Sequence, residues 1–169
     1  MKLIVTALTF LVAGMLQTSF FDYIRIFGVE PNLFLVLIIC FSLLEESLEA
    51  GFIGAIAGII EDAVIGISLG GYTLLNTFLG ISIGSLNKRF VRENLLVSIL
   101  FVFIFSLIYE GVFYFIIFYF SGQQDIFYAF EKIIFPESIY NAAITIIVFP
   151  FVLWIDMWMK DHTRALRKY

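Results

Sequence analysis

Two adjacent carboxylates, Glu61 and Asp62, lie in the stretch "GFIGAIAGIIEDAVIG". All the remaining residues of this stretch are apolar or small. A third acid, Glu110, lies in the mostly apolar stretch "SLIYEGVFYF". An ionised carboxylate inside a membrane costs about 3 kcal/mol or more unless it is neutralised, hydrated or paired. No lysine or arginine lies in the middle of an apolar run, so the acids must be protonated, accept hydrogen bonds from Ser, Thr or Asn such as Asn76, or meet a water-filled pocket or partner chain. Alternatively, the helix ends near Glu61 and both acids cap a loop.

The composition predicts that these acids lie in a membrane. Hydrophobic residues make up 62% of the 169 residues, charged residues only 14%, and the mean hydropathy is +1.02. These values lie far outside the range of soluble globular proteins. We therefore expect an all-α integral membrane protein, with residues 1–169 forming a single transmembrane domain.

Residue patterns typical of enzymes and metal sites are missing from the sequence. The sequence has a single cysteine, Cys40, which falls in an apolar run. Because there is only one, an intramolecular disulfide and a cysteine metal cluster are excluded. The only histidine, His162, lies in the basic C-terminal tail. The sequence also has no H-E-x-x-H or phosphate-binding glycine motif. We expect no enzymatic activity, no cofactor and no bound metal.

Six apolar runs predict six transmembrane helices, and a count of five is the alternative. The run from Pro31 to Leu44 is short for a bilayer, so it must extend through Leu48 or lie where the bilayer is thin. The predicted spans are about residues 3–21, 31–48, 51–67, 72–86, 95–120 and 139–158.

The basic residues predict that both termini lie in the cytoplasm. With the N-terminus inside, eight lysines and arginines fall in cytoplasmic segments, whereas only Arg25 and Lys132 fall outside. The first apolar run is longer than a signal-peptide core and lacks a small-x-small cleavage site, so it should be kept as an anchor. The cytoplasmic (inner) membrane of a bacterium suits this multi-pass chain.

The outer loop before the last span has an amphipathic pattern. Its apolar residues share one helical face: Ile126, Phe127, Phe130, Ile133 and Ile134. Two interpretations are open: a short helix lying in the membrane interface, or residues that cover the top of the bundle.

The third span carries a face of small residues that continues to its acids. Gly54, Gly58 and Asp62 recur every four residues, and Gly51 and Glu61 lie close to the same face. Small residues let helix backbones approach closely, which is how helices associate in lipid. At 1.5 Å per residue, Asp62 would lie about 16 Å beyond Gly51, near the middle of the membrane.

Two stretches of this chain resemble the MreD family of rod shape-determining proteins. The first is "EPNLFLVLII", with Pro31, Asn32 and Leu33 at the start of a span, and the second is "GFIGAIAGIIEDAVIGISLGGYTLLN". The second matches the family pattern of glycines, a later Asp and a Leu-Gly pair: Gly51, Gly54, Gly58, Asp62, Leu69 and Gly70. The resemblance is most specific over residues 17–84.

This resemblance implies a non-enzymatic subunit of the bacterial cell-elongation (Rod) complex, which binds MreC and helps to organise side-wall peptidoglycan synthesis. Further partners that it implies, directly or indirectly, are RodA, a class B penicillin-binding transpeptidase and the MreB filament. Membrane lipids and a second copy of the chain are other candidate partners, and no basic patch suggests nucleic-acid binding. The residues expected to bind a partner or pack the bundle are Pro31, Asn32, Gly51, Gly54, Gly58, Asp62 and Gly70, and the expected buried polar residues are Glu61, Asn76 and Glu110.

A second function follows from a similarity in fold. The family resembles the six-helix substrate-binding subunits of energy-coupling-factor transporters, so the alternative is a membrane subunit that binds a vitamin-type small molecule. Glu61, Asp62 and Glu110 would then line a solute pocket. Such a pocket needs convergent polar and aromatic groups from several spans, of which the sequence offers few.

Overall fold

The computed structural model describes residues 2–19, 25, 28–65, 70–86, 94–121 and 126–166, and these residues are almost entirely helical. The helices are α1 (Lys2–Ser19), α2 (Leu33–Leu44), α3 (Ser47–Ile65), α4 (Gly71–Leu86), α5 (Leu95–Ser121), the short α6 (Ile126–Ala129), the π-helical turn η2 (Phe130–Ile134) and α7 (Phe135–Leu166). The expected all-helical architecture is therefore confirmed.

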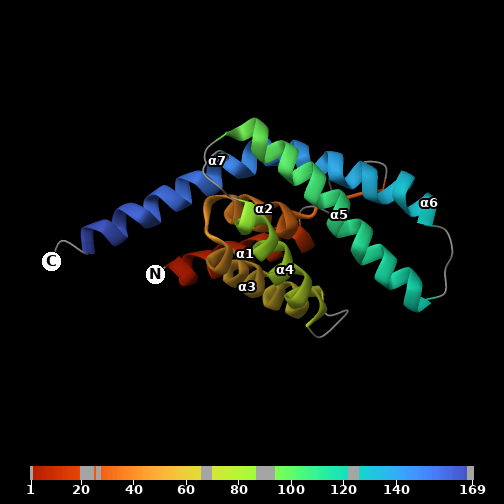
Figure 1. Ribbon diagram of the computed structural model, residues 1–169, viewed down its shortest axis with the longest axis horizontal. Coiled ribbons are helices and arrows are strands. Elements are labelled where there is room, and N and C mark those ends of the chain that lie inside the picture. The colour runs from red at the N-terminus through yellow and green to blue at the C-terminus, as the bar shows by residue number, and fades with distance from the viewer. Residues whose placement is uncertain are drawn as a thin grey trace.

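The short helix α2 forms the centre of the bundle. All twelve of its residues are buried, and it contacts α1, α3, α4, α5 and α7. Figure 1 shows α2 between the α3–α4 pair and the long helices α5 and α7. A helix that is apolar on every side is buried in protein or lipid, and the uniform sequence "LFLVLIICFSLL" agrees with the burial of α2 among the other helices.

The helix α2 is shorter than the predicted second span. It ends at Leu44 because Glu45 has an extended backbone (φ −119°, ψ 162°), and α3 begins two residues later at Ser47. At 1.5 Å per residue, α2 is only about 18 Å long. It therefore cannot reach across a hydrocarbon layer of about 30 Å by itself.

The last helix is longer than expected, because α6, η2 and α7 continue into one another from Ile126 to Leu166. The amphipathic stretch is thus the beginning of this long helix within the described residues. Its π-helical turn lies just before Pro136, which has no backbone N–H to donate. In Figure 1 the C-terminal end of α7 runs out beyond the other helices.

Three described helices are long and apolar enough to cross a membrane: Lys2–Ser19, Leu95–Ile116 and Phe127–Lys160. The apolar α2 is too short to be counted with them. These helices indicate a membrane protein. The number of times that the chain crosses the membrane stays a prediction.

The end of the molecule where α1 starts and α2 ends carries an ionic cluster. The Lys2 ammonium lies 2.7 Å from a Glu45 carboxylate oxygen and also contacts the Glu49 carboxylate. Burial raises the pKa of Glu45, which lies in the turn after α2, to about 7. The cluster joins the start of α1 to the turn between α2 and α3.

Candidate functional site

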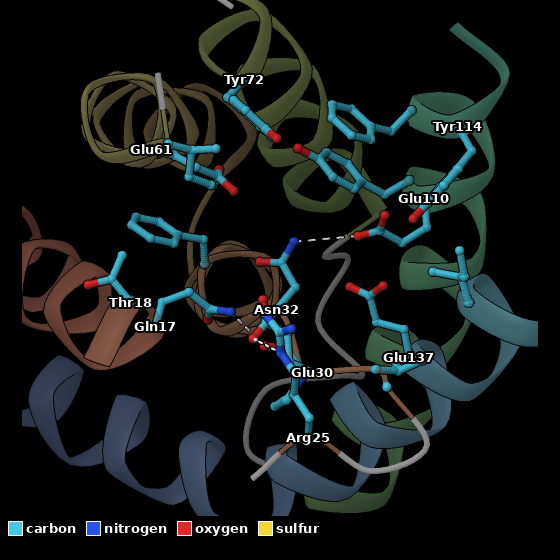
Figure 2. Close-up of a pocket in the computed structure, with 18 residues that line it drawn as sticks. Gln17, Thr18, Arg25, Glu30, Asn32, Glu61, Tyr72, Glu110, Tyr114 and Glu137 are labelled. Atoms are coloured by element: carbon cyan, nitrogen blue, oxygen red, sulfur yellow. Dashed lines mark hydrogen bonds and ion pairs between the residues drawn. The ribbon is translucent and has the colours of Figure 1, made fainter. Parts of the chain in front are cut away.

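A cavity of about 600 Å³ lies at the opposite end of the bundle, where α1 and α3 end and α2, α4 and α7 begin. The second half of α5 completes its wall. Its polar lining, shown in Figure 2, consists of Gln17, Thr18, Arg25, Glu30, Asn32, Glu61, Tyr72, Tyr109, Glu110, Tyr114 and Glu137. A volume of this size matches that of small-molecule sites in proteins.

Side chains from other helices hold the start of α2 beneath this cavity. The Asn32 side chain accepts a hydrogen bond from the Leu35 N–H (3.0 Å), and the Gln17 side chain accepts one from the Leu33 N–H (2.9 Å). The N–H of Asn32 itself donates to Asn141 Oδ1 of α7 (2.8 Å). Because the first N–H groups of a helix have no partner within it, these bonds allow α2 to begin inside the protein.

Glu61 lies at the cavity wall in a chain of buried hydrogen bonds. It is only 2% exposed, and its Oε2 accepts a hydrogen bond from Asn76 Nδ2 (2.6 Å). The Tyr109 hydroxyl donates to Asn76 Oδ1 (2.8 Å). Asn76 therefore connects the α3 carboxylate to α5, and it is the donor that the sequence suggested for a buried acid.

Glu110 and Glu137 form a second acidic pair, across α5 and α7. Glu110 Oε1 accepts a weak hydrogen bond from Asn32 Nδ2 (3.4 Å), and the Glu110 and Glu137 side chains are within hydrogen-bonding reach of each other. Figure 2 shows both carboxyl groups pointing toward the same space. Two carboxylates this close either share a proton or need a cation between them.

An aromatic wall faces the carboxylates. The rings of Tyr72 and Phe113 are stacked with centroids 5.3 Å apart, and Phe113 is nearly parallel to Tyr109 at 6.5 Å. Tyr72 comes from α4, whereas the other two come from α5. The cavity thus combines acids with stacked rings from different helices.

Asp62 points away from this cavity, to the beginning of α4. Its Oδ1 accepts a hydrogen bond from the Tyr72 N–H (3.2 Å), and its Oδ2 accepts bonds from the Thr73 N–H (3.1 Å) and hydroxyl (2.6 Å). A helix N-terminus attracts negative charge and has unpaired N–H groups, so it can hold a carboxylate without a basic partner. Gly70, just before α4, has φ +92°, a conformation that favours glycine.

The position of Asp62 overturns one of the two sequence interpretations, while its depth in the membrane stays a prediction. It lies in the last turn of α3, which begins at Ser47 and ends at Ile65. The helix does not end at Glu61. The acid instead binds the next helix, and this contact joins α3 to α4.

The glycine face of α3 packs against α4 within the chain, and we call this contact the glycine seam. A Cβ atom on Gly54 would lie 2.1 Å from the Asn76 backbone oxygen, and one on Gly58 would lie 2.4 Å from Thr73 Cα. From α4, a Cβ on Gly80 would lie 2.2 Å from the Ala50 backbone oxygen. The two backbones touch, so no side chain fits between them.

The residues singled out from the sequence therefore fall into two groups. Gly51, Gly54, Gly58, Asp62 and Gly70 belong to the seam and to the turn that precedes α4, whereas Pro31, Asn32, Glu61 and Glu110 line the cavity. Asn76 lies between the groups, since its side chain binds Glu61 and its backbone contacts Gly54.

The sequence reasoning missed much of the cavity: Gln17, Tyr72, Tyr109, Tyr114 and Glu137. The sequence did contain a signal for this cavity, because polar or acidic side chains occur near the same end of several predicted spans. Leu69, part of the family pattern, lies outside the described residues.

Comparison with known proteins gives one match. A family model described as rod shape-determining protein MreD matches residues 1–160. No curated protein and no solved structure matches the chain. The expected similarity to transporter subunits therefore stays a prediction, while the family match covers both the seam and the cavity.

Proposed function

The chain belongs to the MreD family of rod shape-determining proteins, and from this membership we propose that it is a non-enzymatic membrane subunit of the bacterial cell-elongation complex. The observation that carries this proposal is the extent of the match, which runs over residues 1–160 and so includes every transmembrane candidate. A role in determining rod shape follows from the family itself.

The internal packing agrees with a scaffolding role. Asp62 and the seam glycines join α3 and α4 by backbone contacts and hydrogen bonds, which gives a rigid helix pair. Large apolar side chains on the outer faces of this pair are exposed in the isolated chain, including Phe52, Leu74 and Phe78. Lipid or the transmembrane helix of a partner can cover these side chains.

We propose MreC as the direct partner, with RodA, the class B transpeptidase and the MreB filament in the same assembly. The test replaces the native copy with a tagged one in a rod-shaped bacterium, then measures cell width and identifies proteins that co-purify after extraction in mild detergent. We expect normal width and recovery of MreC. If cells that lack this protein keep their normal width, the role in cell shape is contradicted. If the tagged copy supports normal width but MreC does not co-purify with it, the direct binding of MreC is contradicted.

We further propose an inner-membrane location with both termini in the cytoplasm, which places the cavity at the outer face. Single cysteines at Ser121 and Arg167, in a Cys40→Ser background, test this orientation with an impermeant thiol reagent on protoplasts. Labelling at position 121 alone is the expected result. Labelling at position 167 alone would show that the orientation is the opposite of the proposed one.

The cavity favours a second candidate, a small-molecule-binding subunit of a transporter. It supplies the convergent polar and aromatic side chains from several helices that the sequence alone did not reveal. The same co-purification distinguishes the two functions. A transporter subunit should bring an ATPase-linked membrane protein and not MreC.

A further inference from the structure

We propose that the cavity between α1, α2, α3, α4, α5 and α7 is a binding site for a small organic cation with an ammonium or guanidinium group. This inference does not depend on the shape-determining role. It rests on the charge of the lining, the aromatic wall, and the Tyr72 hydroxyl, which is directed into the cavity.

The first observation is the charge balance. Among the described residues that line the cavity, four are glutamates (Glu30, Glu61, Glu110 and Glu137) and one, Arg25, is basic. The Arg25 side chain is half exposed, and its Nε lies 3.3 Å from a Glu30 oxygen, so these two opposite charges are paired. The Asn76 and Asn32 amides offer only neutral hydrogen bonds to Glu61 and Glu110. A cation entering here would meet acids that lack a positive partner.

The second observation is the aromatic wall beside these acids. The stacked rings of Tyr72, Phe113 and Tyr109 all line the same cavity. Aromatic faces attract cations and also pack against the apolar body of a ligand. Acids for the charge and rings for the body are the groups that recognise an organic amine.

The third observation is the Tyr72 hydroxyl. Tyr72 is 7% exposed, and its hydroxyl has no hydrogen-bond partner among the described residues, although its backbone N–H is bound to Asp62. Figure 2 shows this hydroxyl directed into the space between Glu61 and Glu110. The side chain is buried but its hydroxyl is accessible from the cavity, so it can form a hydrogen bond with a ligand that enters this space.

The arrangement selects an organic cation over two other ligand classes. No three described Asp, Glu, His or Cys side chains converge closely enough to hold a metal ion. An anion would have to enter an acidic lining in which Arg25, the one basic residue among those described, is already paired with Glu30. A volume of about 600 Å³ accommodates an amine with a ring-sized body.

The test measures binding by isothermal titration calorimetry to the purified full chain in detergent, in an amine-free phosphate buffer. Three probes share the indole ring and differ mainly in the charge of a short side chain: tryptamine (cation), tryptophol (neutral) and indole-3-acetate (anion). Spermidine and agmatine extend the cations to a polyamine and a guanidinium. We expect at least one cation to bind, and for the indole series we expect tryptamine to bind at least tenfold more tightly than tryptophol.

Matched variants locate the site. Glu137→Gln and Glu61→Gln should each weaken cation binding about tenfold, and Tyr72→Phe should weaken it less. Glu131→Gln removes an exposed acid outside the cavity and should change nothing. Gel filtration and thermal unfolding of each variant separate lost binding from lost folding. The proposal would be overturned if tryptamine, spermidine and agmatine all fail to bind, or if tryptophol binds as tightly as tryptamine. It would also be overturned if Glu131→Gln weakens cation binding as much as the cavity variants do.

Discussion

Glu61 and Asp62 are neighbours in the chain but belong to different environments. Asp62 lies in the glycine seam, where three donors from α4 contact its two oxygens. Glu61 lies at the cavity, where the amide of Asn76 is its hydrogen-bond donor. One residue along a helix turns a side chain by about 100°, which is enough to separate the two. A buried acid in a membrane helix can thus be structural, while the next one is available to a ligand.

The two regions also differ in packing. In the seam, the backbones of α3 and α4 touch at Gly54, Gly58 and Gly80. Around the cavity, the helix ends separate and leave about 600 Å³ between them. We therefore expect substitutions in the seam to change stability, and substitutions around the cavity to change binding more than stability.

The largest effect is expected for Gly54→Ala, because the new methyl group would lie 2.1 Å from a backbone oxygen of α4. The helices must separate, which should lower the free energy of unfolding by about 3 kcal/mol. Gly111→Ala is the matched control, since nothing lies within 4 Å of that position on α5. It should be neutral or stabilise by about 0.5 kcal/mol. Thermal unfolding in detergent measures both, and equal midpoints would show that the seam is not tightly packed.

The next effect is expected for Asp62→Ala, which removes the acceptor for three donors at the start of α4. A loss of about 2 kcal/mol follows from the missing helix cap and charge-assisted bonds. Asp62→Asn keeps one carbonyl oxygen but no charge, so its loss should be about half as large. In cells, Asp62→Ala should widen the rods more than Glu61→Ala does. If cells that express Asp62→Ala at the normal level keep their normal width, the contact between Asp62 and α4 is not needed for the shape-determining role.

Local patterns were enough to predict the helices and the small-residue face. The long apolar run at α5 and the recurrence of Gly54, Gly58 and Asp62 every four residues are both visible within a few turns of sequence. They could be predicted because helix geometry fixes which residues share a face.

The cavity could not be predicted, because it depends on how distant helices pack. Asn32 and Asn141 are 109 positions apart, and Tyr109 and Asn76 are 33 apart, yet each pair shares a hydrogen bond. The apolar run that ends at Leu44 was visible, but the sequence did not decide whether the helix continues to Leu48. The contact between Glu45 and Lys2, 43 positions apart in the chain, could not be predicted either.

A smaller effect is expected for Tyr109→Phe, at the boundary between the two regions. The change removes the hydrogen bond to Asn76 Oδ1, in a site where Asn76 is only 1% exposed. Loss of one neutral buried bond should cost about 1 kcal/mol. Tyr128→Phe, at an exposed position, is the comparison variant in the same unfolding assay and should change the stability little. A change of more than 2 kcal/mol for Tyr109→Phe would mean that the cavity network supports the fold as strongly as the seam does.

The smallest stability effect is expected for Tyr72→Phe, and this variant separates the two regions most sharply. The backbone of Tyr72 belongs to the seam through its bond to Asp62, whereas its hydroxyl points into the cavity without a partner among the described residues. Phenylalanine keeps the backbone bond and the ring stacked on Phe113. The free energy of unfolding should therefore change by less than about 0.5 kcal/mol. Cation binding should nevertheless weaken, because a ligand that accepts or donates a hydrogen bond there would lose its partner. A loss of stability larger than that of Tyr109→Phe would show that the hydroxyl has a structural partner, and the contrast between seam and cavity would not hold at this residue.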